Sequence, residues 1–208
     1  MAKRVYLFNE GSKEDRDLLG GKGANLCEMT NLGLPVPFGF IITTSTCREF
    51  FQAGNRLPNL LEQEYRVALD LIEKKMGTRF GDPDNPLLFS VRSGAPVSMP
   101  GMMNTILNLG MNDEITEGLA RKTSNPRFAY DSYRRFIQMF ADVVLDIDGR
   151  LFEGEITRYK DAHSKPLDTD MTAEDWQAVI ETFKSMADFP QDPFEQLKLA
   201  VQAVFLSW

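Results

Sequence analysis

The most informative stretch of this chain is residues 18–29, LLGGKGANLCEM, in which three glycines surround one lysine where a helix is expected to begin. Glycine inside a helix costs up to about 1 kcal/mol relative to alanine. A helix N-terminus presents unpaired N–H groups and a partial positive charge, and glycines let an anion approach them closely. Lys22 adds a full charge there. The stretch indicates an anion site; a tight strand-to-helix turn with a solvated lysine is the alternative.

Short strands alternate with helices around this stretch, which predicts an α/β body for residues 1–110. The clearest helix carries one apolar stripe from Leu61 to Met76, and Gly77 is expected to end it. Strands are expected at residues 4–8, 38–44, 87–92 and 105–110. Helices are expected at 22–33, after a cap at Thr44 or Ser45 up to Gly54, and at 61–77.

The next part of the chain, residues 111–190, shows only helical periodicity and predicts a helical subdomain. Asn112 is expected to cap a short helix, and a long amphipathic helix is expected to start at Pro126. Thr172 and Asp175 have the spacing of a capping box at the start of a further helix.

The last segment, residues 191–208, carries apolar side chains at helical spacing up to Trp208. It is predicted to be a helix that returns to the α/β body. Natural domains rarely stop on an open apolar stripe, so we expect the chain to be a truncated piece of a longer protein.

The composition is that of an ordinary globular protein, with 208 residues, 43% hydrophobic and 25% charged. The net charge of −7 argues against a general nucleic-acid role, so an anion site depends on a few placed cations. Cys27 and Cys47 lack a CxxC spacing and are expected to be small buried hydrophobes. The sequence shows neither a signal-peptide pattern nor a stretch of about 18 apolar residues, so we expect a cytoplasmic protein without membrane binding.

A second stretch, residues 90–110, reads SVRSGAPVSMPGMMNTILNLG and joins an apolar strand to a glycine-containing loop. Arg92 at the expected strand end suits the mouth of an α/β site, and its planar fork holds phosphate oxygens at two points. Gly94 and Gly101 permit a loop that folds over a ligand. The alternatives are a structural ion pair for Arg92 and core packing for the methionines. The first stretch, residues 18–29, fits neither the phosphate-binding P-loop spacing GxxxxGK[ST] nor the dinucleotide-binding spacing GxGxxG.

Three blocks of sequence together resemble the N-terminal nucleotide-binding domain of the pyruvate, phosphate dikinase family. They are LLGGKGANLCEMTNLGLPVPFGFIITT (18–44), FSVRSGAPVSMPGMMNTILNLG (89–110) and NPRFAYDSYRRFIQMF (125–140). The resemblance covers nearly the whole chain. Phosphoenolpyruvate synthases are similar in the first block and the VRS element but usually lack the other features, so the dikinases are the closer resemblance.

This resemblance implies the first part of an ATP-grasp fold, an α/β body with a helical insertion, that binds ATP with magnesium. In that family ATP gives its β-phosphoryl group to a histidine on a swivelling domain, phosphate takes the γ-phosphoryl group, and pyruvate later receives the phosphoryl group from the histidine. Lys22 and Arg92 match the phosphate-contacting, catalytic pair, and Gly101, Met103 and Thr105 match a loop over the nucleotide. Cations are the expected catalytic groups because phosphoryl transfer depends on positioning and charge stabilisation.

The resemblance also implies partners outside this chain: the remaining ATP-grasp half with its acidic metal ligands, the phosphohistidine domain, and a second copy in a homodimer. His163 lies in a polar helix tail and is expected at the surface, and the DTD at 168–170 is expected to be a solvated turn. Asn104 stands where the family usually carries aspartate. Arg134 and Arg135 are expected to form an ion-pair face or to reach an interdomain cleft.

The sequence favours one function and leaves two alternatives. The favoured function is the ATP-binding part of a pyruvate, phosphate dikinase, inactive on its own, because both Lys22 and Arg92 are retained. The alternatives are a phosphoenolpyruvate synthase-like ATP-binding domain and a non-catalytic module that binds a partner through an apolar face.

Overall fold

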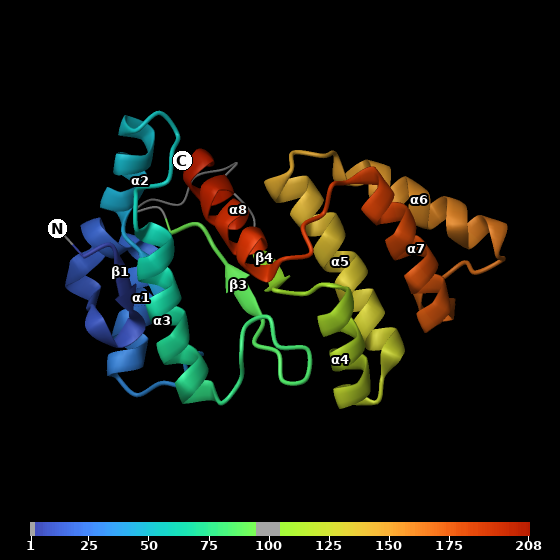
Figure 1. The fold of residues 1–208 in the computed structure, drawn as a ribbon, viewed down its shortest axis with the longest axis horizontal. Helices are drawn as coiled ribbons and strands as arrows, with labels where there is room; N and C mark the ends of the chain where they lie inside the picture. Colours follow the sequence, from blue (N-terminus) through green and yellow to red (C-terminus); the bar gives the residue numbers. More distant parts are fainter. Residues whose placement is uncertain (1–2, 95–104) are drawn as a thin grey trace. The chain divides into compact units, whose positions relative to one another are not determined.

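The computed structural model describes residues 3–94 and 105–208 (Figure 1). The described residues fall into two compact units. The first contains 3–78, 92–94 and 204–208, and the second contains 79–91 and 105–203. The predicted division of the chain at residues 110 and 190 stays a prediction.

The first unit is built on a short antiparallel strand pair. Strand β1 (Val5–Leu7) pairs with β2 (Phe40–Ile42), with Val5 opposite Ile42 and Leu7 opposite Phe40. Helix α3 packs against both strands, while α1 contacts β2 and α2 (Figure 1). Its helices are α1 (Arg16–Asn31), α2 (Thr44–Gln52) and α3 (Leu61–Met76), with the 3₁₀ turns η1 (Phe8–Glu10) and η2 (Lys13–Asp15) between β1 and α1.

Helix α3 confirms the apolar stripe read from the sequence. Leu61, Tyr65 and Ile72 are almost fully buried, whereas Met76 at the end of the stripe is 44% exposed. Gly77 ends the helix in the left-handed conformation, where an L side chain would be strained, as the sequence predicted.

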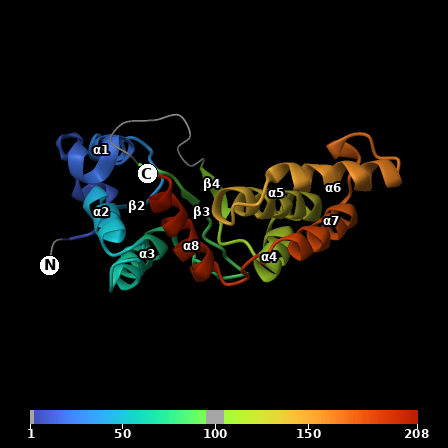
Figure 2. The same cartoon turned by 90° about the horizontal axis from the view of Figure 1, so that it is seen from above.

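The second unit is mostly helical. Strand β3 (Phe89–Val91) pairs antiparallel with β4 (Ile106–Leu109), and α5 packs against β4, α4, α6 and α7. Figures 1 and 2 both show α5 and α7 side by side. The helices are α4 (Asp113–Thr123), α5 (Pro126–Val144), α6 (Gly149–Ala162), α7 (Ala173–Met186) and α8 (Pro193–Leu206), with the 3₁₀ turn η3 (Asp168–Asp170) before α7. The last residues of α8, from Val204, belong to the first unit.

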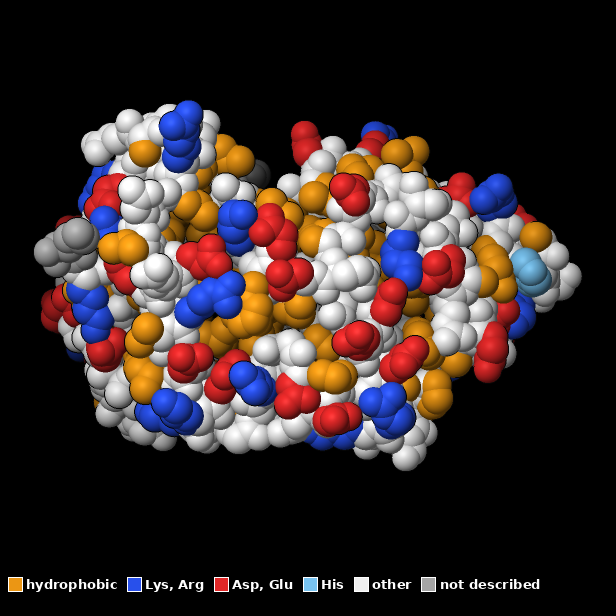
Figure 3. All heavy atoms as spheres, in the orientation of Figure 1, with side chains coloured by type: hydrophobic (Ala, Val, Ile, Leu, Met, Phe, Trp, Pro, Cys, Tyr) orange, Lys and Arg blue, Asp and Glu red, His pale blue; other side chains and the backbone are white. Residues whose placement is uncertain are grey.

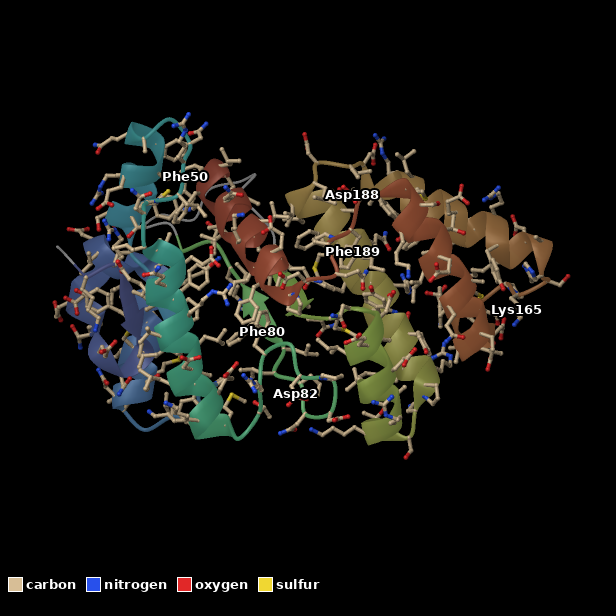
Figure 4. The ribbon with its side chains drawn as sticks, in the orientation of Figure 1. Phe50, Phe80, Asp82, Lys165, Asp188 and Phe189 are labelled. Carbon is tan, nitrogen blue, oxygen red and sulfur yellow. The ribbon has the colours of Figure 1, made fainter. Side chains whose placement is uncertain are left out.

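Aromatic packing forms the core of the second unit. The ring of Phe189 lies 5.5 Å from both Phe136 and Phe140, in edge-to-face geometry, and Figure 4 labels Phe189. Phe152 and Phe183 join α6 to α7 in the same way, at 4.8 Å.

The helix caps of the second unit follow the sequence signals. The side chains of Asn112 and Asn125 accept hydrogen bonds from the first turns of α4 and α5. Thr172 and Asp175 form the expected capping box of α7. Because helices and antiparallel strand pairs are combined in this way, the fold is the mixed α+β class that the sequence predicted.

The surface is charged and mixed. Figure 3 shows acidic and basic side chains interspersed on the face it displays. Within the described ranges, no helix has both the length and the hydropathy that a membrane crossing requires.

Candidate functional site

The first feature of the candidate site is a break in helix α1 at Gly20. This residue has φ 71° and ψ 165°, outside the helical region, and helical geometry resumes at Gly21. Only glycine adopts such a backbone conformation readily. The predicted helix start near Lys22 therefore corresponds to the start of the second segment of α1.

The glycines of this stretch also have structural reasons. A Cβ on Gly23 would lie 3.0 Å from the Ile41 side chain, so the glycine allows α1 to pack closely on β2. Gly20 and Gly21 are buried, as Gly23 is.

Lys22 lies in the first turn after this break, with an exposed side chain. Within the described residues, no carboxylate lies within 4.0 Å of its ammonium group. The backbone N–H groups that open a helical segment favour negative charge, and Lys22 adds to that preference. The position thus offers an anion an exposed cation in the first turn of a helical segment.

Arg92 directly follows β3 and is also exposed. Its expected alternative, a structural ion pair, is not found among the residues that the structure describes. The next residue, Ser93, is 1% exposed, and its hydroxyl oxygen accepts a hydrogen bond from the indole N–H of Trp208 at 3.1 Å. Gly94 completes the described part of this segment.

The two stretches singled out from the sequence meet in the first unit. A Cβ added to Gly20 would lie only 1.6 Å from the carbonyl oxygen of Gly94, so the two backbones are in direct contact. Lys22 is two residues after Gly20, and Arg92 is two residues before Gly94. The fold therefore brings the backbones next to both cations together, and neither cation is buried against a carboxylate in the described ranges.

Helix α2 braces the start of α1. The Thr44 hydroxyl donates a hydrogen bond to the carbonyl oxygen of Asp17 at 2.5 Å. The expected cap at Thr44 or Ser45 is wrong: Thr43 caps α2, because its side chain accepts the Thr46 backbone N–H. The Thr43 hydroxyl also shares hydrogen bonds with those of Ser45 and Thr46, at 2.9 and 2.8 Å. These side chains are polar but mostly buried, so their bonds fix the α1 start against α2.

The remaining predicted site residues are Thr105, Gly101 and Met103. Thr105 is half-buried and precedes β4 in the second unit. Gly101 and Met103 lie outside the described residues, and so does Asn104.

Arg134 and Arg135 form ion pairs, which is one of the two alternatives left open by the sequence. Arg134 is 5% exposed, bonds to Asp131 and Asp168, and lies 4.4 Å from the ring centre of Trp176. Arg135 bonds to the same Asp131. Both arginines therefore serve the helical unit.

The DTD turn and the lone histidine are exposed, as the sequence predicted. Asp168 pairs with Lys160, whose hydrogen bond lowers the pKa of that carboxyl. His163 is exposed at the end of α6, and its ring stacks on Tyr159 with 4.0 Å between centroids. Nowhere in residues 3–94 or 105–208 do three metal-ligating side chains of the His, Cys, Asp or Glu type gather.

The cysteines are buried, as expected. Both are free thiols, and burial raises the pKa of Cys27 and raises that of Cys47 to about 11. A thiol with such a pKa stays protonated at neutral pH and is a poor nucleophile.

Sequence reasoning found both cation-bearing stretches but missed two contacts: the one between Gly20 and Gly94, and the hydrogen bond from Trp208 to Ser93. Two signals were present: Gly20 preceding the GKG triplet, and Gly94 following Arg92-Ser93. Neither signal reveals its contact without coordinates. The role of Trp208 had no sequence signal beyond its place on an apolar stripe.

Comparison with known proteins relates this chain to a nucleotide-binding class of protein. Residues 16–73, which include α1 and Lys22, match the family described as "Pyruvate phosphate dikinase, AMP/ATP-binding domain".

Relatives extend this match over the whole chain. The chain is 51% identical to pyruvate, phosphate dikinase of Clostridium symbiosum, 49% to that of Rhizobium meliloti and 47% to that of Entamoeba histolytica, with 99–100% of its residues aligned. It spans about a quarter of the length of these relatives: 25%, 24% and 24%. The chain is thus a relative of the AMP/ATP-binding domain of the pyruvate, phosphate dikinases, as its motifs indicated.

Proposed function

We propose that this chain is the ATP-binding part of a pyruvate, phosphate dikinase, in which Lys22 and Arg92 bind the polyphosphate of ATP. The observation that carries the proposal is the contact between Gly20 and Gly94, because it joins the segments that bear the two cations. The family match and the relatives' names supply the nucleotide and the reaction.

The chemistry suits these side chains. Lysine is a compact positive charge, whereas the planar fork of arginine binds two phosphate oxygens at once. Placed with backbone donors around a polyphosphate, they stabilise the charge that develops as a phosphoryl group moves. Neither side chain needs to form a covalent bond.

In the proposed reaction ATP, phosphate and pyruvate become AMP, diphosphate and phosphoenolpyruvate. In the first half, the β-phosphoryl group of ATP moves to a histidine on another domain, phosphate receives the γ-phosphoryl group, and AMP and diphosphate leave. The phosphohistidine then passes its phosphoryl group to pyruvate. We further propose an ATP-grasp fold completed by a later part of the parent protein, a homodimeric parent, and a cytoplasmic location.

Magnesium belongs to the proposal as the companion of ATP. The carboxylates that would hold it lie outside this chain in our proposal, since the described residues contain no cluster suited to the ion. Loop residues Gly101, Met103 and Thr105 are proposed to cover the nucleotide.

The test is the first half-reaction in the complete dikinase that carries this chain. Lys22→Ala and Arg92→Ala are expected to slow the ATP-dependent formation of phosphohistidine about 100- to 1,000-fold, the scale of one lost preorganised donor. Lys74→Ala and Arg56→Ala remove exposed cations elsewhere in the first unit and are expected to leave the rate unchanged. Near-normal turnover of Arg92→Ala, or equal losses in the control variants, would reject the site.

A further inference from the structure

The hydrogen bond between Trp208 and Ser93 reaches the middle of the candidate site. Ser93 sits between Arg92, the proposed phosphate ligand, and Gly94, which touches Gly20. Its side chain is buried, and its oxygen accepts the indole N–H of Trp208 at 3.1 Å. An indole nitrogen is a donor only, so the direction of this bond is fixed.

The turn that carries Trp208 is firmly anchored in the first unit. The backbone N–H of Trp208 donates a hydrogen bond to the carbonyl oxygen of Phe205 at 3.2 Å. The Phe205 ring, 4% exposed, lies 5.3 Å from the ring of Phe50 on α2, which Figure 4 labels. The Cys47 thiol also approaches the carbonyl oxygen of Phe205, at 4.0 Å. Trp208 is thus a hydrogen-bond donor in a turn that packs against α2.

These contacts connect helix α2, the start of α1, the Ser93–Gly94 segment and the turn at Trp208 to one another. Helix α2 bonds to the start of α1 through Thr44 and Asp17, and α1 touches Gly94 through Gly20. The turn at Trp208 packs on α2 and bonds to Ser93, the neighbour of Gly94. The backbone beside Arg92 is therefore held from two directions.

We propose that Trp208 and Ser93 are positioning residues for phosphate binding: their hydrogen bond fixes the backbone that carries Arg92. This inference rests on the proposed function, because it assigns to the bond a role in how Arg92 meets the polyphosphate. Arginine has a long side chain, and the rate of phosphoryl transfer depends on where its fork lies. A fixed backbone reduces the positions open to the guanidinium before ATP arrives. The ring of Trp208 is 36% exposed, so losing its N–H affects the site more than the fold.

The experiment is a mutant cycle in the complete dikinase, read as kcat/KM for ATP in the first half-reaction. Trp208→Phe removes the donor and keeps an aromatic ring, while Ser93→Ala removes the acceptor. Each is expected to lower kcat/KM about threefold to tenfold, the scale of one hydrogen bond, and the double variant is expected to lose no more than either alone. Ser207→Ala, whose hydroxyl bonds to Val204 in the same turn, is the matched control and should change kcat/KM less than twofold.

The Arg92→Ala background separates positioning from a general structural role. There, Trp208→Phe and Ser93→Ala are expected to lower kcat/KM less than twofold further, because the group they position is absent. The full effect in that background would overturn the inference, as would the absence of any effect in the wild-type background. If Arg92→Ala itself leaves the rate unchanged, the proposed function fails. If Arg92→Ala is slow but Trp208→Phe and Ser93→Ala are not, only the positioning role fails.

Discussion

The two units of this chain treat their cations differently. In the second unit, Arg134 is 5% exposed and is neutralised by Asp131 and Asp168 beneath the ring of Trp176. In the first unit, Lys22 and Arg92 are exposed, and no carboxylate of the described residues pairs with them. A buried charge needs its counter-charge within the fold, whereas an exposed cation remains available to a ligand.

Lack of a partner alone does not mark a site. Arg48, Arg56 and Lys74 are also exposed in the first unit, and no ion pair of theirs is seen among the described residues. What distinguishes Lys22 and Arg92 is their place beside a backbone contact that only glycine permits. The comparison teaches that backbone geometry, together with a free charge, singles out the candidate site.

The largest effect is expected in the core of the second unit. Phe136→Ala removes a fully buried ring that contacts Phe140 and Phe189, and should lower the free energy of unfolding by about 3–5 kcal/mol. Urea denaturation of the chain measures this. Leu151→Ala, at a side chain 56% exposed on α6, is the control with little expected change. A loss below about 1 kcal/mol for Phe136→Ala would show that this aromatic cluster does not hold the unit together.

The next effect is expected at the backbone contact of the first unit. Gly20→Ala places a methyl group 1.6 Å from the Gly94 carbonyl oxygen at positive φ, so the two segments must separate. In the proposed parent dikinase, the first half-reaction should slow about 100-fold or more, as for loss of a preorganised donor.

Gly33→Ala is the matched control for this change. Gly33 also has a positive φ, 76°, but an added Cβ meets nothing within 4 Å. It should lower stability by about 1–2 kcal/mol while the rate of the half-reaction stays near normal. Equal losses of rate in Gly20→Ala and Gly33→Ala would mean that backbone strain, not the contact with Gly94, matters.

A smaller effect concerns a paired charge in the second unit. Burial raises the pKa of Asp175, but hydrogen bonds from Lys165, Thr172 and Tyr159 outweigh it and hold the pKa well below its usual range. Asp175→Asn leaves Lys165 without its carboxylate and should lower the free energy of unfolding by about 1–3 kcal/mol at pH 7.

The difference in unfolding free energy between wild type and Asp175→Asn is expected to decrease as the pH falls. The folded pKa of Asp175 lies below the unfolded value of about 3.9, so its contribution is complete above pH 5 and is lost as pH falls toward the folded pKa. Urea titrations between pH 7 and pH 3 should show the stability gap between wild type and Asp175→Asn shrinking below about pH 4. Glu117→Gln, at an exposed carboxyl on α4, should show no such gap. A gap that grows on acidification would contradict the assignment.

The smallest effect is expected for an exposed ion pair of the first unit. Arg66 and Glu62 pair one turn apart on α3 at 2.7 Å, with both side chains more than 40% exposed. Arg66→Ala should change the free energy of unfolding by only about 0.3–0.5 kcal/mol in urea denaturation. A loss of more than about 1 kcal/mol in the free energy of unfolding would show that exposure does not predict how much an ion pair stabilises this unit.

Much of the fold was predictable because its signals are local. The stripe of α3, its Gly77 end and the Thr172–Asp175 capping box each lie within one helix and appeared as expected. The strands are shorter than predicted, at three or four residues, because pairing with a distant partner decides where a strand ends. The ion pairs of Arg134 with Asp131 and Asp168 were one of two alternatives, since a charge on a helix face does not show its partner.

The sequence by itself indicated the ends and caps of helices such as α3 and α7, the helical periodicity of residues 111–190, and the two stretches that carry the candidate cations. It did not give the start of α1 at Arg16 or the cap of α2 at Thr43. Capping, periodicity and turn chemistry act over a few neighbouring residues, so the sequence shows them directly. Only the tertiary structure decided that Gly20 meets Gly94 and that Trp208 bonds to Ser93. Those contacts join residues more than 70 and 110 positions apart, and their geometry depends on how whole helices and strands pack.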